Sequence, residues 1–145
     1  MSEQTSSTIE IEAPAEAVMN EIADLEAYPD WTGSVKEVEV LERGADGRPA
    51  LATFVLDAGV VKDTYTLSYT WNGNDSVSWT LVDAQILTAM DGSYRLSAVG
   101  EGATRVEYVL TLDLKMPMIG MLRRKAEKVV TDTALKELKR RVEGQ

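Results

Sequence analysis

The chain has 145 residues, 44% of them hydrophobic and 27% charged, which suits one globular domain with one substantial core. It contains no cysteine and no histidine, which excludes a disulfide, a thiolate nucleophile, a Ser-His-Asp triad and the usual zinc or non-haem iron site. The net charge of −9 argues against a nucleic-acid partner, and the scattered acidic residues show no calcium-loop spacing, so we expect no metal or other cofactor.

The N-terminal stretch MSEQTSST is polar and lacks the basic and apolar segments of a signal peptide. No segment approaches the ~20 uninterrupted apolar residues that a membrane-spanning helix needs. We therefore expect a cytoplasmic protein.

A strand followed by a helix is predicted at the start of the chain. Residues 7–13 alternate, with Ile9 and Ile11 on one face, which is typical of a strand. Residues 14–28 change to helical spacing, with Pro14 well placed in the first turn.

The stretch DLEAYPDWTGSV has two large aromatic residues where the chain turns. Pro29 disfavours helical geometry in the residue before it, so we expect the helix to stop near Tyr28 and a loop to follow. Tyr28 and Trp31 would anchor this loop, and Gly33 would allow the turn into the next strand.

The hydrophobic period is mostly two from Val35 to Met116, which predicts about six further antiparallel strands. The NGND sequence at residues 72–75 predicts a hairpin turn, and Gly92 is a candidate bulge. The inward-facing rows are aromatic. They contain Phe54, Tyr65, Tyr69, Trp71, Trp79, Tyr94 and Tyr108.

The last stretch, residues 117–144, returns to helical period and predicts a helix of about 25 residues, or roughly 37 Å. Residues 115–145 hold nine basic and four acidic side chains, whereas the first 114 residues hold six basic and 20 acidic ones. We expect these cations to form the solvated face of the terminal helix. Peripheral contact with an anionic membrane or an acidic partner is the alternative.

This order of elements predicts an α+β fold. A curved antiparallel sheet of six to seven strands would wrap around the long C-terminal helix, with one or two short helices after the first strand. A helix about 10 Å wide cannot fill the concave side of a broad curled sheet. Large side chains would fill the remaining space, or it would stay open as a pocket.

Four stretches resemble the START-like helix-grip superfamily (SRPBCC), in particular the bacterial polyketide cyclase/dehydrase and lipid-transport group with coenzyme-Q-binding START-type members. They are IEIEAPAEAVMNEIADLEAYPDW, VKEVEVLE, DGSYRLSAVGEGATRVEYVLTLDL and the closing helix. The resemblance implies a single START-like ligand-binding domain over residues 1–145, with a deep apolar cavity between the sheet and the closing helix. It also implies that Tyr28 and Trp31 lie near this cavity and that KMPMIGMLRR (115–124) forms the opposite lip of its entrance.

On this basis we expect binding or carriage of a hydrophobic small molecule, such as a lipid, an isoprenoid quinone or a polyketide-like aromatic. The methionines would supply an adaptable apolar surface. The expected ligand-binding residues are Trp31, Phe54, Tyr65, Leu67, Tyr69, Trp79, Tyr94, Tyr108, Leu110, Met118, Met121 and Leu122.

The alternative function is a polyketide cyclase or aromatase without metal or nucleotide cofactor, which would move protons with cavity tyrosines and Arg or Asp groups. Asp91 and Arg95 share a strand with Tyr94, but alternation places them on the opposite face unless a bulge at Gly92 changes the register. No reactive constellation is visible, so we assign no catalytic residue and favour the binding function.

Overall fold

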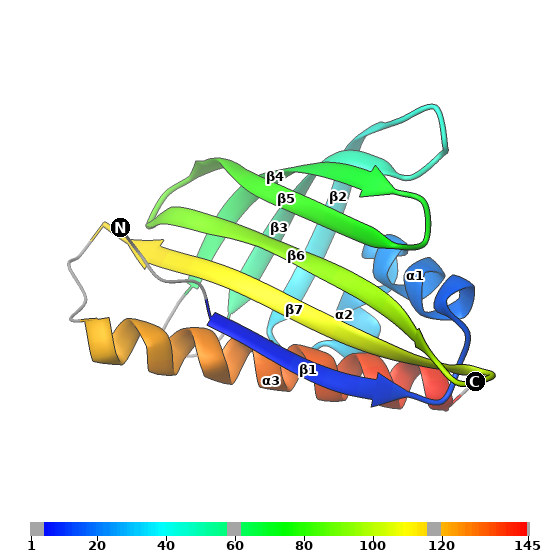
Figure 1. The fold of residues 1–145 in the computed structure, drawn as a ribbon. Coiled ribbons are helices and arrows are strands. Elements are labelled where there is room, and N and C mark those ends of the chain that lie inside the picture. The colour runs from blue at the N-terminus through cyan, green and yellow to red at the C-terminus, as the bar shows by residue number, and fades with distance from the viewer. Residues whose placement is uncertain (1–4, 58–61, 116–119, 145) are drawn as a thin grey trace.

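The computed structural model describes residues 5–57, 62–115 and 120–144, and the side chains of residues 120–123 are not described. Seven strands form one antiparallel sheet in the order β1-β7-β6-β5-β4-β3-β2 (Figure 1). The strands are β1 (Thr5–Ile11), β2 (Val35–Arg43), β3 (Pro49–Asp57), β4 (Lys62–Asn72), β5 (Ser76–Ala84), β6 (Leu87–Val99) and β7 (Ala103–Leu114). The helices are α1 (Ala15–Ala23), the 3₁₀ turn η1 (Leu25–Ala27), α2 (Tyr28–Trp31) and α3 (Gly120–Glu143). The predicted α+β class, sheet and helix order are confirmed.

The hairpin turns follow the sequence signals. In the predicted turn at residues 72–75, the N–H of Asp75 donates to the carbonyl of Asn72 at 3.0 Å. Gly73 has a φ of 55°, a conformation that a side chain disfavours. The NGND prediction is therefore confirmed.

The predicted bulge at Gly92 is wrong. Gly92 pairs in register with Trp79 on β5 and with Leu110 on β7, and the register shift on β6 lies between Leu87 and Ala89. A Cβ atom at Gly92 would lie 2.6 Å from the Trp79 indole. The glycine therefore makes room for a neighbouring ring, which explains its place in a regular strand.

The predicted end of the first helix is also wrong. Helix α1 ends at Ala23, because Asp24 has a non-helical ψ of 70°. Tyr28 has helical angles and Pro29 lies in the first turn of α2, where no intrahelical N–H is required. Gly33 has no positive φ, so the turn into β2 does not depend on glycine geometry.

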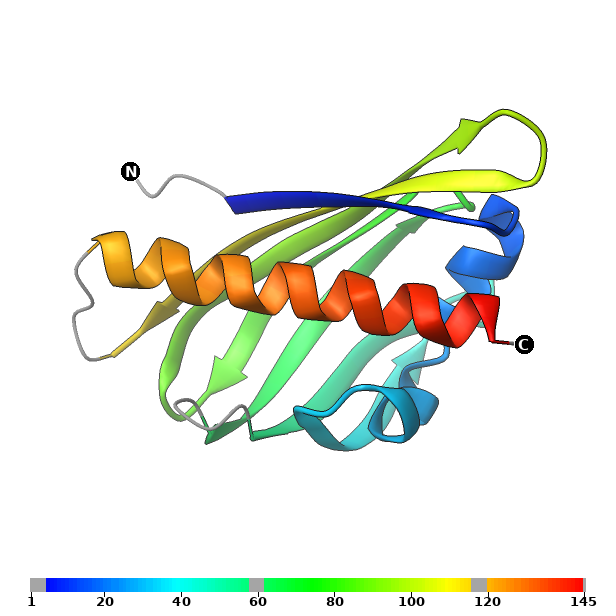
Figure 2. The same ribbon diagram turned by 90° about the horizontal axis from the view of Figure 1, so that it is seen from below.

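Helix α3 runs along one side of the concave face of the curved sheet (Figure 2). Its strand contacts are concentrated on β1 and β7, and α1 and α2 pack near it as well. The other half of the concave face, formed by β3, β4 and β5, therefore lies beside the helix and not beneath it.

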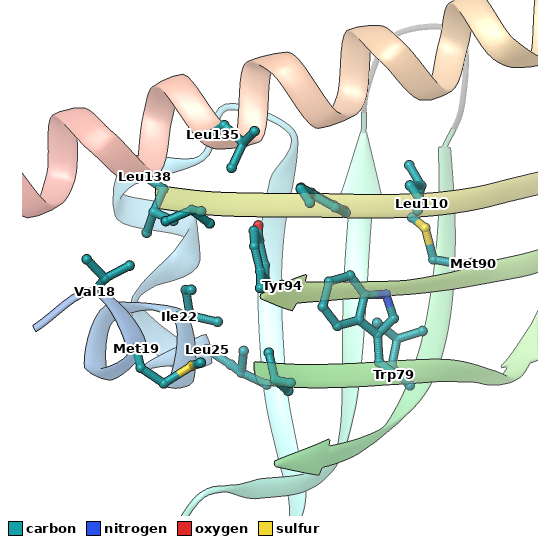
Figure 3. Close-up of a cluster of buried hydrophobic side chains, with 14 of the residues drawn as sticks. Val18, Met19, Ile22, Leu25, Trp79, Met90, Tyr94, Leu110, Leu135 and Leu138 are labelled. Atoms are coloured by element: carbon teal, nitrogen blue, oxygen red, sulfur yellow. The ribbon is translucent and has the colours of Figure 1, made fainter. Parts of the chain in front are cut away.

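The core under α3 is closely packed. Leu135 and Leu138 of α3 face Val18 and Ile22 of α1 in Figure 3, and all four side chains are buried. Nearer the start of α3, a polar cluster joins the helix to the sheet: the fully buried Glu127 accepts hydrogen bonds from the Leu112 N–H at 2.7 Å and the Thr5 hydroxyl at 2.6 Å.

No helix among the described residues is long and apolar enough to cross a membrane.

Candidate functional site

A cavity of about 410 Å³ lies between α3 and the uncovered half of the sheet. Its walls come from the concave faces of β3 to β7, from α2 and the segment after it, and from one side of α3. The lining also includes the exposed residues Val129 and Thr133 of α3, the Thr32–Val35 segment and the end of β3. The space exists because α3 covers only the β1 and β7 side of the sheet.

A continuous aromatic wall lines this cavity. It begins at α2, where the Tyr28 and Trp31 rings meet edge to face at 5.0 Å, and reaches Phe54 on β3 at 6.4 Å from Tyr28. Phe54 stacks on Tyr65 of β4 at 5.4 Å. Alternation on adjacent antiparallel strands brings these rings together, since side chains at i and i+2 share a face.

The wall continues across the sheet to β7. Trp79 of β5 lies 5.8 Å from Tyr69, 5.5 Å from Tyr94 and 5.7 Å from Tyr108. The Tyr94 and Tyr108 rings are 4.6 Å apart, and Figure 3 shows Tyr94 reaching from β6 toward α3 with its hydroxyl oxygen nearest the helix. Trp79 is therefore the centre of the cavity floor, held over Gly92.

The cavity tyrosines are neutral hydrogen-bond donors. Burial raises the pKa of Tyr28, Tyr65, Tyr69, Tyr94 and Tyr108, and repulsion from neighbouring groups adds to the rise for all but Tyr108. These groups therefore keep their protons at neutral pH, which makes them poor bases.

The tyrosine hydroxyls differ in their partners. The Tyr28 hydroxyl donates to the Ile22 carbonyl at 2.5 Å, which ties α2 to α1. For the other four tyrosine hydroxyls, no hydrogen bond is formed within the described residues. The Trp31 indole N–H is buried and has no partner among them either.

Two carboxylates lie in the described lining, Asp57 on β3 and Glu137 on α3. Glu137 accepts the Gly33 N–H at 2.9 Å, which joins α3 to the segment after α2. Asp57 lies 3.9 Å from the exposed Lys62 ammonium. Neither is part of a group of three or more acidic side chains that could hold a metal, and the described residues contain no such group.

Most of the predicted site residues line the cavity. The eight that do are Trp31, Phe54, Tyr65, Leu67, Tyr69, Trp79, Tyr94 and Tyr108. Leu110 does not: it is fully buried in the core. Met118 and the side chains of Met121 and Leu122 lie outside the described residues, as does most of the predicted entrance at 115–124.

Two further predictions concerned side chains on the sheet. Trp71 is not in the lining; its indole N–H donates to the Pro49 carbonyl at 2.6 Å near the end of β4. Arg95 is exposed on the outer face of the sheet. The arginine considered for the cyclase alternative is therefore outside the cavity.

Sequence reasoning expected the start of the closing helix to contribute, but it missed the middle of α3 and the carboxylates. The lining includes Val129, Val130, Thr133, Ala134 and Glu137, which recur at helical spacing, and three of them are apolar residues of the predicted terminal helix. That spacing was visible in the sequence, but the rotation of the helix that turns this side toward the cavity was not. Ile22, Tyr28, Leu56 and Met90 were also missing from the predicted set.

Comparison with known proteins agrees with this geometry. The family model described as polyketide cyclase / dehydrase and lipid transport matches residues 11–139. The chain belongs to this family. No match to the chain was found among curated proteins.

Solved structures share the fold of this polyketide cyclase / dehydrase and lipid transport family member. A START superfamily protein from Mycobacterium smegmatis is 24% identical, with a TM-score of 0.91 over 97% of each chain. A protein from Thermus thermophilus is 25% identical, with a TM-score of 0.80 over 98% of each chain. The Zhui aromatase/cyclase from Streptomyces sp. R1128 is 18% identical, with a TM-score of 0.75 over 97% of this chain and 95% of its own. The chain thus belongs to the polyketide cyclase / dehydrase and lipid transport family and shares its fold with these solved structures.

Proposed function

We propose that this protein binds and carries a hydrophobic small molecule in the cavity beside α3, and that residues 1–145 form one ligand-binding domain. The observation that carries the proposal is a cavity of about 410 Å³ whose walls are mainly aromatic and aliphatic. Such walls, with a few polar groups, are typical of small-molecule sites. Removing apolar ligand surface from water at about 25 cal/mol per Å² supplies the affinity.

The side chains that contact the ligand in this proposal are the aromatic wall and the aliphatic residues around it. Trp79 is central because it touches three tyrosines from three different strands. The cavity is at the small end of the ~300–1,000 Å³ range of ligand pockets, which favours a compact ligand such as a quinone ring or a polyketide-like aromatic over a two-chain lipid.

The cyclase alternative has weaker support. Proton transfer needs a base whose pKa lies near the working pH, and the raised pKa values of the cavity tyrosines keep them protonated. Among the described lining residues the only acidic or basic side chains besides the tyrosines are Asp57 and Glu137, and no arginine accompanies them. Carriage of a ligand requires none of these groups to react.

The test is uptake of the neutral fluorescent probe N-phenyl-1-naphthylamine by the purified chain, with native mass spectrometry of any molecule that co-purifies. Val130 lines the cavity from α3, so Val130→Phe fills part of it. Lys136→Phe adds the same ring on the exposed side of the same helix and is the matched control.

We expect uptake by the wild type and by Lys136→Phe, and at least tenfold weaker uptake by Val130→Phe. A folded wild type that takes up no probe, or a Val130→Phe variant that binds as well as the wild type, would contradict the proposal. Turnover of an added poly-ketone would favour the cyclase.

A further inference from the structure

Tyr94 of β6 and Tyr108 of β7 form a pair of phenol side chains on the floor of the cavity. They lie directly opposite each other in the antiparallel ladder between these strands, so both side chains project from the same face of the sheet. Their ring centroids are 4.6 Å apart, and Trp79 packs against both rings at 5.5 and 5.7 Å. The sheet therefore holds the two rings side by side.

The two hydroxyl groups are near each other but have no hydrogen-bond partner. Burial is the main cause of the raised pKa of Tyr94, and Tyr108 is the next one, an electrostatic effect that requires the two groups to be close. Within the part of the chain that the structure describes, neither hydroxyl donates to the other or to any other group. Since both phenols keep their protons at neutral pH, the pair offers two free O–H donors.

These two hydroxyls open onto the cavity. Both residues line it, and Figure 3 shows the Tyr94 hydroxyl pointing from β6 toward α3, which forms the opposite wall. Among the described residues, a polar side-chain atom that is both shielded from water and without a partner occurs only at Trp31. The partnerless hydroxyls of Tyr94 and Tyr108 therefore keep accessible surface. Because the two side chains are otherwise buried, that surface faces the cavity.

Two neighbouring donors of this kind suit a carbonyl oxygen. Such an oxygen has two lone pairs and no proton of its own, so it can accept from both hydroxyls at once. A hydrocarbon at the same place would displace water from the two hydroxyls without replacing its hydrogen bonds, which costs free energy for each group. The pair therefore favours a ligand that brings an acceptor to this part of the floor.

We infer that Tyr94 and Tyr108 form a two-donor subsite that binds one carbonyl oxygen, so that the ligand of the cavity is a carbonyl compound with an apolar body. The inference rests on the proposed function, because it assigns a polar contact to the ligand of the same cavity. The surrounding aromatic rings bind the apolar body, and the two hydroxyls set its orientation. The strand pairing has already positioned both donors, so little conformational entropy is lost when they bind.

The test compares two probes that differ only in the group offered to the tyrosines. 2-Acetylnaphthalene has a carbonyl group where 2-ethylnaphthalene has a methylene group. Dissociation constants are measured by quenching of tryptophan fluorescence for the wild type, Tyr94→Phe, Tyr108→Phe and the double variant, and circular dichroism confirms that each is folded. Each substitution removes a hydroxyl and keeps the ring. Ser97→Ala removes a hydroxyl from the exposed face of β6 and is the control.

The expected loss of affinity is specific to the ketone. Each single variant should bind 2-acetylnaphthalene about fivefold more weakly than the wild type, the typical effect of one hydrogen bond, and the double variant about 25-fold more weakly. Binding of 2-ethylnaphthalene should stay the same or become tighter, because no hydroxyl then loses its water. Ser97→Ala should bind both probes as the wild type does.

The infrared carbonyl band of bound, isotope-labelled 2-acetylnaphthalene is the second readout. A hydrogen bond to the carbonyl oxygen lowers the frequency of this band, whereas a purely structural role of the tyrosines leaves it unchanged. We expect the lowest frequency in the wild type, an intermediate one in each single variant and the highest in the double variant.

The outcomes are distinguishable. Equal losses for ketone and hydrocarbon, no loss of ketone binding in the double variant, or the same carbonyl frequency in the wild type and the double variant would each overturn the inference and leave the proposed function standing. A folded wild type that binds neither probe overturns both.

Discussion

The two halves of the concave face are built from the same kind of strand, but one is covered by α3 and the other borders a cavity. On the β1 and β7 side, α3 lies directly on the sheet, and the space is filled by aliphatic side chains such as Leu138 and by the hydrogen-bonded Glu127. On the other side, from β3 to β6 and at Tyr108 of β7, aromatic rings face a cavity of about 410 Å³. We call these two sides the closed half and the open half. A single long helix can close only one half of a curved sheet, so its position decides which half becomes a core and which a binding site.

The strongest test of this difference is one substitution made in both halves. Leu138→Ala removes a fully buried side chain from the closed half, and we expect it to lower the free energy of unfolding by about 4 kcal/mol. Leu67→Ala acts on a side chain that already borders the cavity and should cost about 2 kcal/mol, because fewer packed neighbours are lost.

Urea denaturation measures the free energy of unfolding of both variants. Ser78→Ala, on the exposed face of β5, serves as the control. If the two leucine variants lost equal stability, the open half would be packed like the closed half and the comparison would fail.

The next largest effect is expected at Asp63, which joins β4 to the turn between β5 and β6 without any hydrogen bond from the described residues of α3. Its carboxylate accepts the backbone N–H groups of Gln85, Ile86 and Leu87 at 2.8–3.1 Å. Burial alone would raise its pKa, but these hydrogen bonds, with one from Thr64, lower it. Asp63→Asn should cost about 3 kcal/mol, because some of these buried N–H groups lose their acceptor.

The lowered pKa of Asp63 also gives a pH dependence. The stabilisation is fully present above the unfolded-state pKa of about 4 and is lost as the pH falls toward the lower folded-state pKa. The wild type should therefore lose more stability between about pH 4.5 and 2.5 than Asp63→Asn does. If the stability of the wild type and of Asp63→Asn fell equally over this pH range, the Asp63 carboxylate would not have the lowered pKa that its hydrogen bonds indicate.

Gly92 tests the floor of the cavity. An added Cβ would lie 2.6 Å from the Trp79 indole and 2.9 Å from the Val109 carbonyl, so Gly92→Ala should cost about 2 kcal/mol and displace the Trp79 ring. At Gly33 the same atom would lie 3.7 Å from its nearest neighbour, which makes Gly33→Ala the control. Thermal unfolding and tryptophan emission are measured, and an unchanged emission spectrum in Gly92→Ala would contradict the assigned packing.

The smallest effects separate two tyrosine hydroxyls. Tyr28→Phe removes the hydrogen bond to the Ile22 carbonyl and should cost about 1 kcal/mol. Tyr108→Phe removes a hydroxyl that has no partner within the described residues and should change stability by no more than about 0.5 kcal/mol. Chemical denaturation of both variants checks this, and an equal loss would mean that the Tyr108 hydroxyl has a structural role.

The sequence was sufficient to predict the sheet, because alternation is a local property of each strand. It therefore also predicted that Tyr65, Tyr69 and Tyr108 face inward. Local alternation could not distinguish Leu110 from Tyr108: both lie on the same face of β7, and only the position of α3 decides which one meets the core and which the cavity.

Two other features also depend on tertiary structure. The end of α1 at Ala23 follows from the backbone at Asp24, where no proline or glycine marks a break. Glu137 has no distinguishing sequence signal, but the rotation of α3 turns it toward the segment after α2. Glu137 and the Gly33 that it contacts both belong to the cavity lining, so the sequence predicted the aromatic floor of the cavity better than this part of its wall.

The most direct test of the central claim is a methyl NMR titration with 2-ethylnaphthalene, an apolar probe without hydrogen-bonding groups. Met90, Leu67 and Val130 line the cavity, whereas Leu138 and Val142 lie in the closed half. The account predicts saturable shifts and probe-to-methyl NOEs at the first three residues, with the other two unchanged. Shifts concentrated at Leu138 and Val142, or none at the cavity methyl groups, would contradict it.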